Sequence, residues 1–267
     1  MSAEETHKVI RNRLVGMAEM ARLVDSKNIN IGELARDSKY IRICGESFRA
    51  VSLLDSYPLC GVNKSGSKRL DTILKQLELW KGDSLAPEVL KHKGERRLQC
   101  WLIHNALQNK RDLMKPLGLG NEIFDKLLFA LDEVSLGDSN HSLENLSGFK
   151  STIDCENEIK IVRSDIIAVG IKNKEVFPVI IELKYDRSRK RLKEQLENFR
   201  KLIEIFNEEF KQLLKDCTGH VVNSEPKKIL IWPALENTNH VTINELHKEG
   251  IGVIEFKGSY QFDSYLV

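Results

Sequence analysis

The spacing of apolar residues divides the chain into a helical first third and a longer part in which strands alternate with helices. Within residues 1–85, apolar positions recur near a 3.6-residue period from Val9 to Val24 and again from Leu70 to Leu79. This period is typical of amphipathic helices. We therefore expect a helical N-terminal region over 1–85 and a second domain over 86–267.

The second region carries patterns of both kinds. Apolar positions predict one helix over 94–109 and a long amphipathic helix after Lys184, whose inner face holds Leu192, Leu196, Phe199, Ile203, Phe206 and Phe210. Continuous apolar runs predict strands over 165–171, 176–184, 228–232 and 251–256.

The connections between these segments predict how the strands pair. A helix between the last two strands is expected to begin at a capping box, Thr242-x-x-Glu245, and to end before Gly250. A strand–helix–strand unit of this length implies a parallel pair, whereas a short turn joins antiparallel strands. The expected fold is therefore α/β, with a mixed β-sheet flanked by helices.

Composition excludes several classes of protein. The 267 residues are 41% hydrophobic, which argues against disorder, and the net charge is only +2, so a polyanion would be bound by a local basic patch. Five scattered cysteines without a C-x-x-C pair exclude a disulfide framework and the usual zinc spacings. No apolar run approaches the roughly 20 residues that span a bilayer, and no signal-peptide pattern is present. We expect a cytoplasmic protein without a membrane partner.

The first two strands bring charged residues together. Asn173 tolerates the left-handed backbone of a tight hairpin, and a turn centred between Asn173 and Lys174 pairs Asp165 with Glu182. Directly opposed residues share a face, with Cβ atoms about 4.5–5.5 Å apart. Lys184 lies two residues further along and therefore on the same face. The open end of the hairpin is expected to hold two carboxylates and an ammonium group.

One residue puts this pairing at risk. Pro178 lies inside the second strand, lacks a ladder donor and can mark a β-bulge. A one-residue slip in register would turn Glu182 away from the face of Asp165.

The opposed acids indicate a cation. Two like charges face to face are destabilising, and Mg²⁺ (or Mn²⁺) with oxygen ligands at about 2.0–2.1 Å would compensate them. Such an ion polarises a phosphoryl group and lowers the pKa of bound water. Lys184 would orient the attacking water and offset charge in the transition state. The Ile181 carbonyl or Glu95 would complete the metal site through water.

This arrangement resembles the PD-(D/E)xK phosphodiesterase superfamily, the fold of many restriction endonucleases and repair nucleases. Asp165 and the Glu182-Leu-Lys184 triplet match its name-giving motif, with Ser164 in the place of proline. Gln195, four residues before a phenylalanine, resembles the Q-x-x-x-Y motif of RecB-type members. Glu95 resembles the acidic residue on the first core helix of the family.

The resemblance covers roughly 90–257 and implies a restriction-endonuclease-like fold and a metal-dependent nuclease. Asp165 and Glu182 would then bind the metal and act with Lys184 in catalysis. Gln195 would support Lys184 or contact the phosphate backbone. The substrate that the resemblance implies is nucleic acid, with DNA preferred.

A basic run follows the proposed site and would contact phosphates. Its members are Arg187, Arg189, Lys190, Arg191 and Lys193.

Several alternatives stay open on the sequence. Glu156 or Glu158 could replace Glu95 as the third carboxylate. The chain could be a catalytically inactive nucleic-acid-binding or regulatory protein on the same fold. RNA as the substrate, endonuclease or exonuclease action, and a homodimer are equally compatible with these patterns.

Overall fold

The computed structural model describes most of the second region and parts of the first. The described residues are 3–25, 40–43, 46–49, 95, 98–99, 101–102, 105–106, 109–137, 143, 146, 161–185, 192–234, 240–257 and 261–266.

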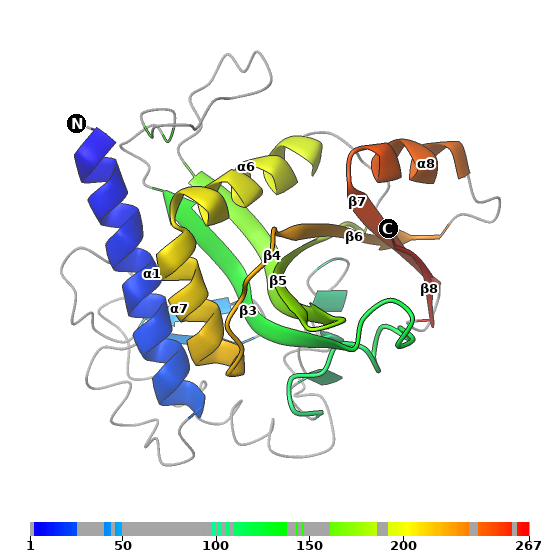
Figure 1. Cartoon of the computed structure of the whole chain (residues 1–267), viewed down its shortest axis with the longest axis horizontal. Coiled ribbons are helices and arrows are strands. Elements are labelled where there is room, and N and C mark those ends of the chain that lie inside the picture. The colour runs from blue at the N-terminus through cyan, green and yellow to red at the C-terminus, as the bar shows by residue number, and fades with distance from the viewer. Residues whose placement is uncertain are drawn as a thin grey trace.

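The centre of the molecule is a six-stranded sheet whose strands lie side by side in sequence order (Figure 1). Its members are β3 (Lys126–Gly137), β4 (Ile161–Lys172), β5 (Glu175–Leu183), β6 (Lys227–Pro233), β7 (Ile251–Lys257) and β8 (Gln261–Tyr265). The β5–β6 and β6–β7 pairs are parallel and the other three are antiparallel. The predicted mixed α/β sheet is confirmed, and β3 and β8 are strands that the sequence analysis did not identify.

Helices cover the sheet on both faces. One hydrophobic cluster joins the sheet to α1 (Ala3–Asp25), α6 (Leu192–Ile205), α7 (Asn207–Thr218) and α8 (His240–Lys248). A second cluster joins it to the helix that carries Leu98 and Leu102. Ile180 of β5 belongs to the first cluster and its neighbour Ile181 to the second, so the two clusters lie on opposite faces. None of the helices in the described ranges combines the length and hydropathy that crossing a membrane requires.

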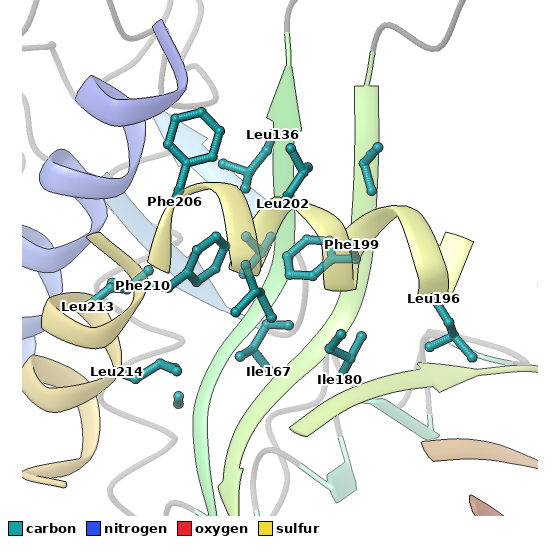
Figure 2. Close-up of a cluster of buried hydrophobic side chains, with 14 of the residues drawn as sticks. Leu136, Ile167, Ile180, Leu196, Phe199, Leu202, Phe206, Phe210, Leu213 and Leu214 are labelled. Carbon is teal, nitrogen blue, oxygen red and sulfur yellow. The ribbon is translucent and has the colours of Figure 1, made fainter. Parts of the chain in front are cut away.

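The long helix predicted after Lys184 is in fact two helices. Phe206 separates α6 from α7 with backbone angles of φ −107° and ψ 39°. Its side chain is fully buried, and the rings and methyl groups of both helices gather over Ile167 and Ile180 (Figure 2). The apolar spacing continues across the break without glycine or proline, which is why the sequence pattern predicts a single helix.

The hairpin between β4 and β5 has the predicted turn. Asn173 and Lys174 both have positive φ, 49° and 71°, as a two-residue type I′ turn requires. Pairing runs without a shift from Lys172 opposite Glu175 to Ile166 opposite Ile181.

Pro178 does not disturb this register. Val176 directs its N–H and C=O to Asn223, on the side of β5 away from β4. Alternate residues of a strand point their backbone groups to the same side, so the missing N–H of Pro178 also faces away from β4. β6 begins its pairing one residue later, with Lys227 opposite Val179. The bulge considered at Pro178 is therefore absent from the β4–β5 pair.

A glycine and an aromatic ring face each other across the same hairpin. Gly170 lies opposite Phe177, and a Cβ atom on Gly170 would be only 2.3 Å from the ring. Phe177 is buried and packs against Phe124, with ring centroids 6.0 Å apart. Only glycine fits under this ring without displacing it.

The N-terminal region is not wholly helical in its described parts. α1 confirms the first predicted helix, and its Ile10 and Leu14 are buried in the same cluster as α6 and α7. A two-stranded antiparallel hairpin follows, β1 (Tyr40–Ile43) with β2 (Glu46–Arg49), where helix was expected. The second predicted helix, over 70–79, lies outside the described residues.

Two smaller predictions concern helix ends. The described positions between Glu95 and Ala106 are helical, as expected. α8 begins at His240, two residues before Thr242, so the predicted capping box is wrong. Gly250 does adopt the left-handed conformation after this helix, with φ 67°.

Candidate functional site

The predicted acids lie where β4 and β5 separate, at the carboxyl end of β5. The backbone ladder ends with Ile166 opposite Ile181, and the next step of the same register sets Asp165 opposite Glu182. Here a side chain continues the ladder, because the Leu183 N–H donates to Oδ2 of Asp165 at 2.7 Å. The Asp165 carboxylate is thereby fixed between the two strands.

Lys184 lies against the second acid. Its Nζ is 2.7 Å from Oε1 of Glu182, and the two side chains are 15% and 3% exposed. The Lys184 N–H donates to the Ile231 carbonyl at 2.8 Å, which extends the parallel pairing with β6 beyond the end of β5. Hydrogen bonds to β4 on one side and to β6 on the other therefore fix the backbone from Glu182 to Lys184.

A helix from the other face of the sheet reaches the same point. Gln99 Nε2 donates to the backbone carbonyl of Asp165 at 3.0 Å. Glu95 lies one helical turn before Gln99, and Leu98 and Leu102 anchor this helix in the second hydrophobic cluster. Glu95 is near enough to act electrostatically on both Asp165 and Lys184.

The charges of the site change each other's protonation. Burial raises the pKa of the Asp165 carboxyl well above its usual range, and the charge of Glu182 raises it further. The Leu183 N–H and the Lys184 ammonium act in the opposite direction but do not outweigh these two effects.

Lys184 responds to the surplus of acid. Partial burial acts to lower the pKa of its ammonium, but the attraction of Glu182 and the hydrogen bond to it outweigh burial and raise the pKa. Lys184 is therefore held as a cation beside two acids, one of which is destabilised in its charged form.

The donor set fits a hard divalent cation bound with water. Among the described residues, no group of three or more His, Cys, Asp or Glu side chains is arranged to hold a metal ion. Mg²⁺, however, is usually bound by one or two protein carboxylates, and waters and substrate phosphate oxygens complete its shell. Burial and, after it, the charge of Glu182 raise the pKa of the Asp165 carboxyl, and a bound divalent ion would offset both effects.

The remaining predicted residues lie at different distances from this centre. Gln195 is half-buried in the first turn of α6, and among the described residues no hydrogen bond joins it to Asp165, Glu182 or Lys184. Phe199, one turn later, is fully buried with its ring edge-on to Phe210.

The basic run is described only at its last member. Lys193 is 66% exposed at its side chain and pairs with Glu249 at 2.7 Å. Arg187, Arg189, Lys190, Arg191 and the two alternative acids, Glu156 and Glu158, lie outside the described residues.

Two residues near the site were missed by the sequence analysis. Gln99 was available as a polar residue four positions after Glu95, but only the folded chain identifies its partner. Glu133 lies on β3 between Asp132, opposite Ile166, and Val134, opposite Ser164, so its register position is beside Asp165. Recognising β3 as a strand would have made Glu133 a candidate acid.

Comparisons with known proteins give this chain no family. A scan against protein-family models found no match, and a search of curated proteins found no relative.

Proposed function

We propose that this protein is a divalent-metal-dependent nuclease that hydrolyses phosphodiester bonds, with DNA as the preferred substrate. The proposal depends on one observation above all. The buried Glu182 and the half-buried Asp165 lie at the open end of a hairpin beside the ammonium of Lys184.

Each residue has a defined part in this proposal. Asp165 and Glu182 would hold Mg²⁺ or Mn²⁺, with Glu95 as a third acid acting through water. The bound ion would polarise the phosphoryl group and activate water. Lys184 would orient that water and offset the negative charge that develops on the phosphate. Because Glu182 accepts a hydrogen bond from Lys184, one carboxylate links the ammonium to the metal-binding pair.

The order of elements supports a restriction-endonuclease-like architecture. The helix carrying Glu95 is followed by β3, the β4–β5 hairpin, α6 and α7, β6, α8 and β7. Apart from β3 and the division of the long helix into α6 and α7, this agrees with the predicted order of helix, hairpin, helix, strand, helix and strand. Gln195, on α6, would contact the phosphate backbone of the substrate.

A second candidate is a nucleic-acid-binding protein without catalytic activity. The 2.7 Å contact between Lys184 and Glu182 favours it, because the ion pair already compensates one acid without a metal. Asp165 argues for the first candidate, since the raised pKa of its carboxyl reflects a charge that this ion pair does not compensate.

A cleavage assay separates the two candidates. Plasmid, linear duplex, single-stranded DNA and RNA are incubated with Mg²⁺, Mn²⁺ or EDTA and with the wild type, Asp165→Asn or Glu197→Gln. The proposal expects cleavage by the wild type with metal, none with EDTA, and loss of cleavage in Asp165→Asn only. Glu197→Gln is the matched control, because it removes a carboxylate charge on α6, outside the proposed site. If the wild type cleaves no substrate with either metal, the second candidate is favoured.

A further inference from the structure

An exposed aromatic ring lies directly beside the proposed site. Tyr185 follows Lys184 in the chain, and its side chain is 56% exposed. Within the described part of the chain, the exposed large apolar side chains are Val15, Tyr185 and Val221. Tyr185 is the one among them that adjoins the charged cluster.

Other rings support Tyr185 from behind. Its centroid is 6.1 Å from that of Phe256, which is only 8% exposed. Phe256 is followed by Phe262 at 6.5 Å, and Phe262 stacks on Trp101 at 5.8 Å with an interplanar angle of 24°. Phe262 and Trp101 are both half-buried. We call Tyr185, Phe256, Phe262 and Trp101 the aromatic track.

The aromatic track borders the site at both of its ends. Tyr185 is joined to Lys184 by a peptide bond. Trp101 lies on the helix that carries Glu95 and Gln99, two residues after the amide that binds the Asp165 carbonyl. The track lies on the face of the second hydrophobic cluster, opposite to the face of Asp165, Glu182 and Lys184. It therefore adjoins the site where β5 ends and where the helix with Gln99 approaches Asp165.

The sequence that follows Tyr185 is basic. The sequence places four basic residues within the six positions after Tyr185, with a single acid among them. At the other end, the acid next to Phe262 is compensated, because Lys257 lies 2.6 Å from Asp263. Aromatic rings beside a basic segment are the combination with which proteins bind single strands.

We propose that Tyr185, supported by Phe256, is a stacking platform for an unpaired base, so that the protein selects single-stranded nucleic acid or single-stranded ends over intact duplex. A duplex keeps its bases stacked on each other and cannot offer a free base face to an exposed ring. The inference extends the proposed function, since it names the substrate form that the phosphodiesterase site would receive.

Binding in EDTA tests the platform separately from catalysis. Fluorescence anisotropy would measure the affinity of the wild type, Tyr185→Ala, Tyr185→Phe and Val221→Ala for a labelled single strand and for a hairpin duplex with the same number of phosphates. Tyr185→Ala should weaken binding of the single strand about 5- to 150-fold and change duplex binding less than about twofold. Tyr185→Phe should bind like the wild type, because the ring is retained. Val221→Ala is the control for removing an exposed apolar side chain.

The outcomes distinguish the two proposals. If Tyr185→Ala binds the single strand as tightly as the wild type, or loses both substrates equally, the platform is overturned, whatever the cleavage assay gives. A wild type that binds neither substrate overturns it as well. If Tyr185 controls single-strand binding but no substrate is cleaved, the platform stands and the nuclease proposal fails.

Sedimentation measures whether a second copy of the chain, and not a nucleic acid, binds to the aromatic track. A dimer in the wild type that becomes a monomer in Tyr185→Ala would show that the aromatic track is a self-interface and overturn the platform. An unchanged oligomeric state, together with selective loss of single-strand binding, supports it.

Discussion

Two charged clusters, one where β4 and β5 separate and one between α6 and β6, differ in how their charges are matched. Around Glu197, Arg200 donates at 2.7 Å and Lys228 at 3.4 Å, so this acid has two cations, one of which, Arg200, also pairs with Glu204. The hydrogen bond from Arg200 lowers the pKa of the Glu197 carboxyl. Around Asp165, one ammonium serves at least two acids, and the pKa of the Asp165 carboxyl is raised.

The two clusters also differ in how far their acids are exposed to water. The Glu197 side chain is 24% exposed, so water helps to stabilise its charge, whereas Glu182 is 3% exposed. Buried acids in excess of bases are costly unless a cation joins them. A cluster with this imbalance, at the end of two diverging strands, is therefore the place to look for a metal and a reaction.

The largest expected effect compares the lysines of the two clusters. Lys184→Ala should lower the rate of DNA cleavage about 10²- to 10³-fold, because it removes a group that stabilises the transition state. Lys228→Ala removes the cation beside Glu197 and should leave the rate unchanged. Initial rates under single-turnover conditions with Mg²⁺ check both. Equal losses in the two variants would mean that the clusters do not differ in function.

The second prediction concerns metal binding to the native state. Mg²⁺ at about ten times its Kd should add about 1.4 kcal/mol to the free energy of unfolding of the wild type, which is about 3–6 °C in Tm. The Glu197→Gln variant should show the same shift, and Asp165→Asn should show almost none. Thermal unfolding with Mg²⁺, Mn²⁺ and EDTA measures it. A full shift in Asp165→Asn would place the metal elsewhere in the molecule.

The third prediction is that Asp165 and Glu197 make the free energy of unfolding depend on pH in opposite directions. The native state binds the Asp165 proton more tightly than the unfolded state, so the wild type loses stability as pH rises above about 4. Asp165→Asn keeps an acceptor for the Leu183 N–H and should exceed the wild type by about 1 kcal/mol at neutral pH, less in acid.

Glu197 should behave in the reverse sense. Its lowered pKa stabilises the native state above the ordinary pKa of glutamate, and this contribution is lost on acidification. Glu197→Gln should therefore cost up to about 1 kcal/mol at neutral pH, less in acid. Denaturant unfolding from pH 4 to 8 in EDTA measures both variants. Parallel pH profiles for the two would contradict the contrast between the clusters.

The smallest expected effect is at an exposed pair outside both clusters. Lys193 pairs with Glu249 on the surface, so Lys193→Ala should change the free energy of unfolding by less than about 0.5 kcal/mol. If Lys193 contacts phosphate as proposed, the slope of log affinity against log salt concentration should fall by about one. Titrations at several salt concentrations check this, and an unchanged slope would remove Lys193 from the interface.

The sequence was sufficient where local chemistry decides the structure. Asn173 in the turn, with the alternation of the two strands, was enough to predict the register that pairs Asp165 with Glu182, and the register of the hairpin agrees. The strand–helix–strand spacing at the end of the chain was enough for the parallel pair of β6 and β7.

The sequence analysis missed elements whose apolar pattern is irregular or weak and contacts between residues far apart in the chain. β3 has a register shift between Phe129 and Leu131, which interrupts the alternation by which a strand is recognised. β8 is a short edge strand with exposed positions, and its pattern is weak. The bond from Gln99 to the Asp165 carbonyl joins residues 66 positions apart, so no local pattern contains it.

The glycine beneath the Phe177 ring limits how this hairpin can change in evolution. Because Gly170 and Phe177 must stay opposite each other, a lone insertion or deletion between them and the acids would either form a bulge or send Asp165 and Glu182 to opposite faces. Residues could be gained at the tip in equal numbers on each side without this penalty. Homologues of this chain should therefore vary in hairpin length by even steps, with the small residue and the ring inherited together.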